Sequence, residues 1–321
     1  MPLARRAALA LVAVLAAGGP ALAQDRPLVA VTAIVEHPAL DATRDGVKEA
    51  LAAEGFVDGQ TIRWLFESAQ GSPATAAQIA RRFVGEAPAV IVPISTPSSQ
   101  AMAAATREIP IVFSSVTDPL GAKLVGDLAH PGGNVTGMSN MTPMGKHLDL
   151  VQEIVPGVRR LGVVHNPGEA NSRTLLKLLQ AEAPPRGITI VEAPAAKSAD
   201  VQEAARSLVG RADAIYVPTD NTVVTALEAL IQVGRENKLP VIAGDIDSVP
   251  RGAIAALGFD YMDVGRQTGR MVARVLRGEK PGDLPVEFAQ TLELAVNPAA
   301  AAAMGVTLPE ALVARADIVV R

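Results

Sequence analysis

Short continuous runs of apolar residues alternate along the chain with longer stretches in which apolar residues recur every third or fourth position. Continuous runs are typical of strands buried on both faces, and the wider spacing is typical of helices packed on one side. The alternation therefore predicts β–α–β units with parallel sheets. Strands are expected near residues 28–35, 62–67, 89–93, 111–114, 160–165, 188–193, 214–218 and 241–243, and helices near residues 41–54, 73–84, 97–107, 172–182, 198–210, 221–237 and 263–277.

The second half of the chain repeats the first. IARRFVG at residues 79–85 returns as AARSLVG at 204–210, and APAVIVP at 87–93 returns as ADAIYVP at 212–218. Two copies of this size predict an α/β protein with two Rossmann-like, doubly wound parallel-sheet lobes joined by a hinge. We assign residues 27–137 to an N-terminal lobe, 138–257 to a C-terminal lobe, and 258–321 to a crossover helix and tail shared between the lobes, with the lobe of 284–321 left open.

The first 23 residues have the pattern of an export signal. Arg5 and Arg6 precede an apolar run at residues 7–17, and Ala-Leu-Ala at 21–23 matches the small-residue cleavage rule. The run is shorter than the ~20 residues that a membrane-spanning helix needs. The chain contains no cysteine, the residue that carries the lipid of a bacterial lipoprotein. We therefore expect a periplasmic protein without a lipid anchor.

Composition and motifs narrow the function classes. The formal net charge is −4 and there is no basic stripe, which argues against a nucleic-acid partner. The histidines have no zinc-ligand spacing, and the sequence has no Gly-x-Ser-x-Gly elbow, P-loop or Gly-x-Gly-x-x-Gly fingerprint. We therefore predict that the chain is not an enzyme and needs no metal or cofactor, and we expect a monomer.

Polar residues follow the strands of both lobes, where ligands bind in open α/β sheets. The repeat pairs Ser95 with Asp220, and a second match (109–113 with 239–243) pairs Ser115 with Asp245. Hydroxyls beside a helix N-terminus suit an anion, and carboxylates suit an ammonium. The predicted ligand is therefore a zwitterion, an α-amino acid or a close analogue. The same residue types are also preferred helix caps, so each could serve that role instead.

Aromatic residues are only 3% of the chain, so those near a strand end are informative. Phe259 and Tyr261 follow a strand and are candidates for the binding site, whereas Tyr216 lies within a strand and is expected in the core. We expect the ligand to contact His37, Ser95, Thr96, Ser115, Thr117, Asp118, Asn171, Thr219, Asp220, Asn221, Asp245, Asp247, Phe259 and Tyr261.

The chain carries seven short motifs in a fixed order. They are EHPALD at 36–41, TPSSQA at 96–101, TDP at 117–119, PGGNVTG at 131–137, EANS at 169–172, PTDN at 218–221 and GFDY at 258–261. Together they resemble the ABC transporter substrate-binding family that includes tryptophan/tyrosine-binding proteins. The resemblance covers nearly the whole chain after the leader.

That resemblance implies a type I periplasmic-binding-protein fold with three crossovers between the lobes, which close on the ligand by a hinge motion. It also implies that a small molecule, with an aromatic amino acid the leading candidate, is delivered to an ABC permease and its ATPase in the inner membrane. Two alternatives stay open at this point. The chain could bind its ligand for a signalling receptor, or it could bind another solute such as a nucleoside or sugar.

Overall fold

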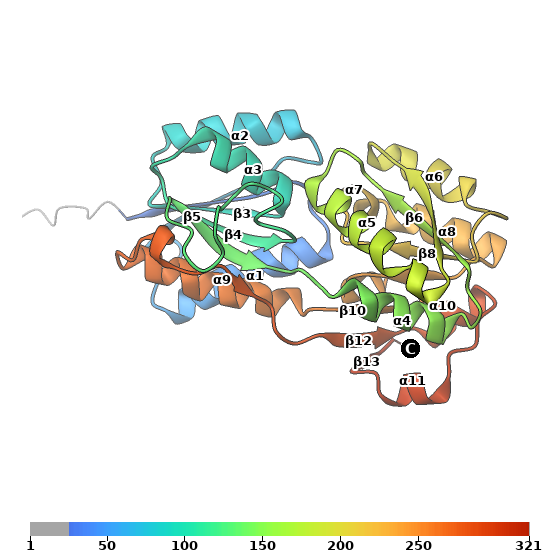
Figure 1. Cartoon of the computed structure of the whole chain (residues 1–321). Helices are drawn as coiled ribbons and strands as arrows, with labels where there is room; N and C mark the ends of the chain where they lie inside the picture. The colour runs from blue at the N-terminus through green and yellow to red at the C-terminus, as the bar shows by residue number, and fades with distance from the viewer. Residues whose placement is uncertain (1–25, 321) are drawn as a thin grey trace, which may run out of the picture.

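Two sheets covered by helices form two lobes that lie side by side (Figure 1). The computed structural model describes residues 26–320, so the predicted leader at 1–23 lies outside the described residues. The predicted α/β class with two Rossmann-like lobes is confirmed.

The first sheet has six strands, and all its neighbouring strands run parallel. In spatial order they are β11 (Glu287–Phe288), β5 (Val135–Ser139), β4 (Ile111–Val116), β3 (Val90–Ile94), β1 (Leu28–Ala33) and β2 (Arg63–Ser68). Its helices are α1 (Pro38–Ala53), α2 (Pro73–Gly85), α3 (Thr96–Ala105), α9 (Tyr261–Leu276) and the 3₁₀ turn η4 (Pro281–Asp283). Helices α1 and α9 cover one face, and α2 and α3 cover the other (Figure 1). The inner strands are buried throughout, as their continuous apolar runs require.

The second sheet has seven strands, of which only β12 runs antiparallel to its neighbour β10. In spatial order they are β13 (Ile318–Val319), β12 (Glu293–Val296), β10 (Ala255–Gly258), β9 (Val241–Ala243), β8 (Ala214–Val217), β6 (Arg160–His165) and β7 (Thr189–Pro194). Its helices are α4 (Met144–Ile154), α5 (Ala170–Glu182), α6 (Val201–Ser207), α7 (Asn221–Thr225), α8 (Leu227–Asn237), α10 (Pro298–Ala303) and α11 (Glu310–Ala314), with 3₁₀ turns η1 (Pro184–Arg186), η2 (Ser198–Asp200) and η3 (Ile246–Ser248).

The chain passes between the sheets three times, after β5, after β10 and between β11 and β12. Our expected boundary after residue 137 falls inside β5, which continues in the first sheet to Ser139. The tail that the sequence left unassigned is divided, because β11 pairs with β5 while β12 and β13 join the second sheet.

Two expected helices differ from the structure. The helix expected over 221–237 is divided into α7 and α8, because Ala226 leaves the helical region with φ −109° and ψ 27°. The helix expected over 198–210 begins with the turn η2, and α6 ends at Ser207. Strands β11 and β13 have two residues each, which is too short for a periodic pattern to reveal.

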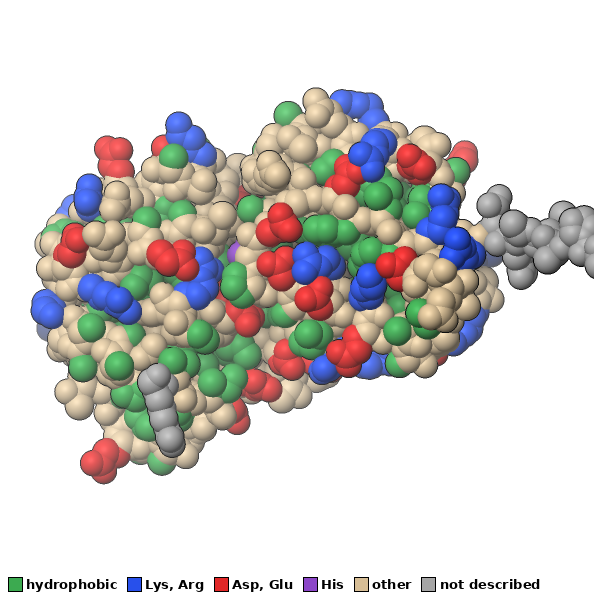
Figure 2. Space-filling view, turned by 180° about the vertical axis from the view of Figure 1, so that it is seen from behind, with side chains coloured by type: hydrophobic (Ala, Val, Ile, Leu, Met, Phe, Trp, Pro, Cys, Tyr) green, Lys and Arg blue, Asp and Glu red, His purple; other side chains and the backbone are tan. Residues whose placement is uncertain are grey.

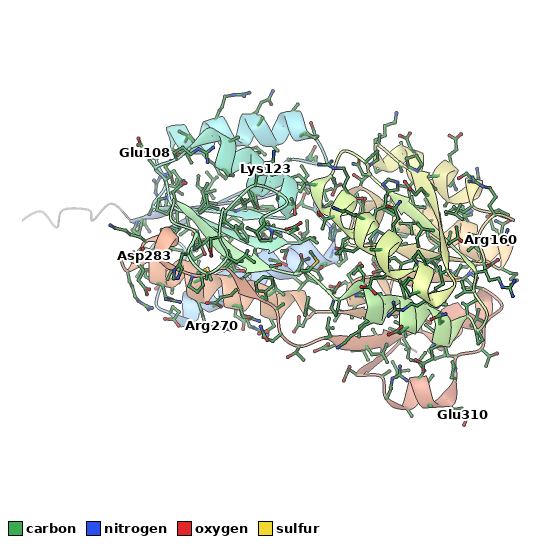
Figure 3. The ribbon with its side chains drawn as sticks, viewed as in Figure 1. Glu108, Lys123, Arg160, Arg270, Asp283 and Glu310 are labelled. Carbon is green, nitrogen blue, oxygen red and sulfur yellow. The ribbon has the colours of Figure 1, made fainter. Side chains whose placement is uncertain are left out.

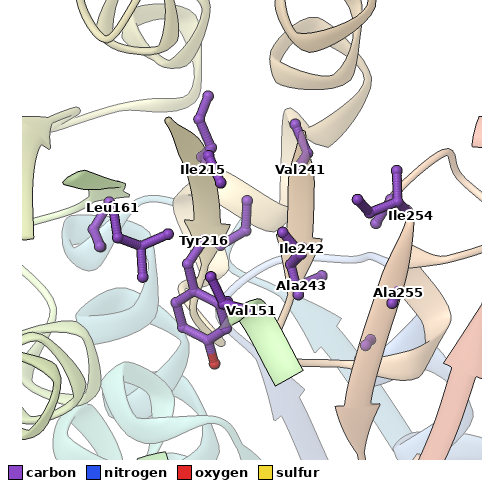
Figure 4. Close-up of a cluster of buried hydrophobic side chains, with 14 of the residues drawn as sticks. Val151, Leu161, Ile215, Tyr216, Val241, Ile242, Ala243, Ile254 and Ala255 are labelled. Atoms are coloured by element: carbon purple, nitrogen blue, oxygen red, sulfur yellow. The ribbon is translucent and has the colours of Figure 1, made fainter. Parts of the chain in front are cut away.

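Each lobe has its own hydrophobic core. Figure 4 shows the core of the second lobe, where Tyr216 of β8 extends between apolar side chains of the neighbouring strands. The Tyr216 hydroxyl lies 3.0 Å from His147 Nδ1 of α4, so its polar end is satisfied inside the core. The expected core position of Tyr216 is confirmed.

Helices α1 and α9 pack closely because glycines line their contact. A Cβ at Gly46 would lie 2.2 Å from the Met262 carbonyl oxygen, and a Cβ at Gly265 would lie 2.2 Å from the Thr43 carbonyl oxygen. Helix α9, which returns from the second lobe, is thereby fixed against α1 of the first. Both helices begin at the boundary between the lobes (Figure 1).

Acidic and basic side chains form no large region of one sign on the face of the molecule opposite to that in Figure 1. Figure 2 shows acidic and basic groups interspersed on the rear face, with an indentation where the lobes meet.

Within residues 26–320, no helix combines the length and the apolar character needed to cross a membrane. The charged residues labelled in Figure 3 are all exposed and lie on the outer sides of the lobes: Glu108, Lys123, Arg160, Arg270, Asp283 and Glu310.

Candidate functional site: a polar cavity between the lobes

A small cavity of about 20 Å³ lies between the lobes, where the carboxyl ends of both sheets meet. Ten of the fourteen residues that the sequence predicted for a ligand site line it. They are His37, Thr96, Ser115, Thr117, Asn171, Thr219, Asp220, Asn221, Asp245 and Tyr261.

Four predicted residues do not line this cavity. Ser95 is buried one position earlier than Thr96, at the start of α3. Asp118 faces the second lobe beside the cavity, and Asp247 lies in the turn η3. Phe259 packs in the core of the first lobe, because the chain there crosses between the sheets and turns its side chain away from the cavity.

Sequence reasoning missed several residues of the cavity wall. Asn140 follows β5 in a crossover, and its Nδ2 donates to the Tyr261 hydroxyl at 2.9 Å. No sequence pattern had identified β5, so the end of that strand gave no signal. Three apolar residues complete the wall: Ala39, Leu40 and Val224.

The wall from the first lobe carries hydroxyl groups and no charge among its lining residues. Helix α3 begins there, and its first turn presents unpaired backbone N–H groups, as every helix start does. Thr96 Oγ1 and Ser95 Oγ are buried and have no hydrogen-bond partner. The backbone at Ser95 and Ser115 takes positive φ values of 80° and 54°, a strained conformation that tends to occur at functional sites. This wall suits an anionic group.

The wall from the second lobe contains Asp220, whose side chain is fully buried. Its Oδ2 accepts a hydrogen bond from the Asn166 backbone N–H at 2.6 Å, and its Oδ1 accepts one from Val223 at 3.0 Å as the cap of α7. Burial, together with the negative charge of nearby Glu169, raises the pKa of Asp220 to about 7. Asp220 therefore caps a helix and also faces the cavity.

Glu169 was not among the predicted residues, yet it organises this wall. Its Oε1 accepts from the Thr222 backbone N–H at 3.1 Å and the Thr222 hydroxyl at 2.8 Å. Its Oε2 accepts from Asn171 Nδ2 at 3.1 Å and from the Asn221 backbone N–H at 3.2 Å. The carboxylate thus holds two cavity residues, Asn171 and Asn221, in fixed orientations. The EANS motif, in which Glu169 precedes Asn171 by two positions, was the sequence signal that could have identified Glu169.

Asp245 and Asp247 extend the acidic character toward the crossovers. Asp245 is buried and accepts hydrogen bonds from the Ser248 backbone N–H at 2.9 Å and the Ser248 hydroxyl at 2.8 Å. Burial raises its pKa. Burial and the charges of Asp245 and Asp260 raise the pKa of Asp247 to about 7, and its Oδ2 has no hydrogen-bond partner.

None of these four carboxylates, Glu169, Asp220, Asp245 and Asp247, forms an ion pair with a described lysine, arginine or histidine. Buried carboxylates are costly without a positive partner. This wall therefore favours a cationic group on a ligand. The same part of the chain contains no cluster of histidine and acidic side chains arranged for a metal ion.

His37 is the histidine on the wall of the first lobe. Burial, and the positive charge of Arg251 from the second lobe, lower the pKa of His37 to about 3. The imidazole is therefore neutral near pH 7 and adds no charge to this wall. Its Nδ1 is buried and has no hydrogen-bond partner.

A wider groove of about 690 Å³ opens beside the cavity, on the side of the edge strands β2 and β7. Asn221 borders both spaces. The groove is bounded by residues 70–73 of the first lobe and residues 196–198 of the second.

Comparison with known proteins identifies relatives of the same design. A family model described as ABC transporter substrate binding protein matches residues 28–320. A tyrosine-binding protein from Clostridioides difficile is 39% identical over 269 residues, which cover 84% of this chain and 78% of that protein.

Two solved structures of relatives differ in whether a ligand is bound. An ABC domain from Streptococcus pneumoniae in complex with L-Trp is 31% identical with a TM-score of 0.89, over 92% of this chain and 100% of that one. A substrate-binding protein with adhesive properties from Clostridium difficile, in its ligand-free, open structure, is 37% identical with a TM-score of 0.69, over 92% and 99%. The resemblance inferred from the seven motifs is confirmed: this chain belongs to the ABC transporter substrate-binding protein family.

Proposed function

We propose that this protein binds an α-amino acid with an aromatic side chain, tyrosine or tryptophan, in the cavity between its lobes. We further propose that it does so in the periplasm and delivers the ligand to an ABC permease and its ATPase in the inner membrane. The relatives named for tyrosine and solved with L-Trp support this class of ligand.

The observation that carries the proposal is the opposition of two chemically different walls. In the proposed complex the ligand carboxylate lies at the start of α3 near Thr96, where free N–H groups and a hydroxyl await an acceptor. The ligand ammonium lies by Asp220 and Asp245, neither of which forms an ion pair with a described residue. The cavity as it stands has room for about one water molecule, so the walls move apart to admit the ligand, whose aromatic ring then packs against Leu40 and Val224.

The arrangement of the lobes supports binding by closure. This chain aligns better with the L-Trp complex than with the open, ligand-free relative, although its identity to the open relative is higher. The structure thus resembles the ligand-bound relative more than the open one, which supports its assignment to a closed form. Ligand binding that favours this form is the population shift expected of a hinged binding protein.

The experiment is a thermal-shift screen of the twenty amino acids, with nucleosides and sugars as further arms, followed by calorimetric titration of the ligands found. We expect stabilisation by L-tyrosine or L-tryptophan. Stabilisation by a nucleoside or sugar, and by no amino acid, would contradict the proposal. Uptake of the ligand into vesicles that contain the permease and ATPase then tests transport, and binding without uptake would favour a signalling role.

Asp245→Asn provides a clean test of the ammonium site. Asparagine keeps both contacts with Ser248, because its oxygen accepts from the backbone N–H while its amide donates to the hydroxyl. The substitution therefore removes charge without removing the cap. We expect affinity for the amino acid to fall about 10- to 100-fold in calorimetry, with the ligand-free protein still folded. Unchanged affinity would mean that Asp245 acts only as a cap.

A further inference from the structure

One hydrogen bond joins the two lobes away from the crossovers. Thr174 Oγ1, on α5 of the second lobe, donates to Asp118 Oδ2 of the first lobe at 3.3 Å. Among the side-chain hydrogen bonds of residues 26–320, no other connects the lobes outside the crossover segments. Neither residue lines the cavity.

Asp118 is held in place by its own loop. Its Oδ1 accepts a hydrogen bond from the Gly121 backbone N–H at 2.8 Å, and its carbonyl oxygen accepts one from Ala122 at 2.8 Å. Gln100 of α3 donates to the Ala122 carbonyl at 3.1 Å and ties this loop to the helix. A Cβ at residue 121 would lie 2.1 Å from Asp118 Oδ2, so glycine leaves the carboxylate free to meet the second lobe.

Thr174 lies on the same helix as a residue of the cavity. Asn171 lines the cavity and Thr174 follows three positions later, so the two side chains lie on the same side of α5. Buried Leu175 anchors this helix in the core of the second lobe. A movement of the second lobe that brings Asn171 to the ligand therefore also brings Thr174 to Asp118.

We propose that Thr174 and Asp118 form a latch that stabilises the closed arrangement, and that Thr174 is a positioning residue that slows release of the ligand without touching it. The inference rests on the proposed function, because it assumes that closure accompanies binding. A hydrogen bond present only in the closed form raises the closed population by its own free energy. Loss of one such bond should weaken binding and speed dissociation about 2- to 10-fold.

The test compares Thr174→Val with Thr75→Val. Thr75 is also a half-buried threonine in a helix, α2, and its hydroxyl makes no hydrogen bond with a described residue. Dissociation of L-tyrosine and L-tryptophan is measured by stopped-flow fluorescence, and the radius of gyration by small-angle X-ray scattering. We expect faster dissociation and a larger ligand-free radius for Thr174→Val, with the control equal to wild type. Dissociation equal to wild type in both variants would overturn the latch.

A double-mutant cycle assigns the effect to this pair. Asp118→Ala also disturbs its loop, so its own cost should exceed that of Thr174→Val, but the second substitution should then add little. Fully additive effects would overturn the pairing. If wild type binds neither amino acid, the proposed function fails, and the latch is then tested by scattering of the ligand-free proteins alone. Equal radii of gyration for wild type and Thr174→Val would refute the latch.

Discussion

At the scale of single residues, the second-lobe wall combines capping and binding roles in the same side chains. Asp220 and Asp245 each accept two hydrogen bonds from their own lobe and still face the cavity. The sequence left open whether these residues cap a helix or face a ligand site. A capping carboxylate can also face the cavity, so the two roles do not exclude each other. What distinguishes these carboxylates from ordinary caps is burial without an ion pair to any described residue.

This burial predicts how stability depends on pH. The pKa values of Asp220 and Asp247 are raised to about 7, so between roughly pH 4 and 7 the folded protein holds protons that the unfolded chain has released. These two carboxyl groups make the free energy of unfolding fall as pH rises through this range, whereas buried His37 and His147, whose pKa values are lowered to about 3 and about 4, make it rise. Urea unfolding at several pH values measures the slope. Asp247→Asn removes one contribution that falls with pH, so the free energy of unfolding of the variant should rise more with pH than that of wild type, and a slope unaltered by the substitution would contradict the assignment.

At the scale of elements, the contact between α1 and α9 fixes the cavity wall to the hinge. Helix α1 begins beside Ala39 and Leu40, and α9 begins with Tyr261, so both contribute to the cavity. The Ser114 hydroxyl of β4 lies 2.6 Å from the Thr268 hydroxyl and ties α9 to the sheet. Glycine at the helix contact is what permits this close approach.

Gly265→Ala should therefore destabilise the protein. The new methyl group would meet the Thr43 backbone carbonyl, which cannot move without moving α1, and such overpacking costs about 1–3 kcal/mol. Urea unfolding measures the loss. Gly85→Ala is the matched control, because a Cβ at this helical glycine meets no atom within 4 Å and should leave stability equal or slightly higher. Equal stability of both variants would show that α1 and α9 can separate without cost.

At the scale of the whole molecule, three crossovers join lobes that each have a separate core. Such a design moves as two bodies about a hinge, and a ligand between the lobes contributes its binding free energy to the closed form. The cavity walls come from both lobes, so neither lobe alone forms the site.

This coupling predicts a specific size of stabilisation. At a free ligand concentration of one hundred times Kd, L-tyrosine or L-tryptophan should raise the free energy of unfolding by about 2.7 kcal/mol, because only the folded protein has the site. Chemical denaturation with and without ligand measures this difference. In Asp245→Asn the same ligand concentration should give a much smaller increase, and an undiminished increase would place the ligand elsewhere.

Much of the fold and of the cavity wall could be predicted from the sequence alone. Continuous apolar runs and the repeat predicted the two parallel-sheet lobes, because a strand buried on both faces needs such a run. Strand ends indicated ten cavity residues, since the carboxyl ends of parallel strands share one edge of a sheet. Only the tertiary structure decided which lobe receives β11 and β12, that Asn140 joins Tyr261, and that Asp118 meets Thr174 instead of the cavity. These pairings depend on how the two lobes are oriented about the crossovers, and no local pattern of residues encodes that orientation.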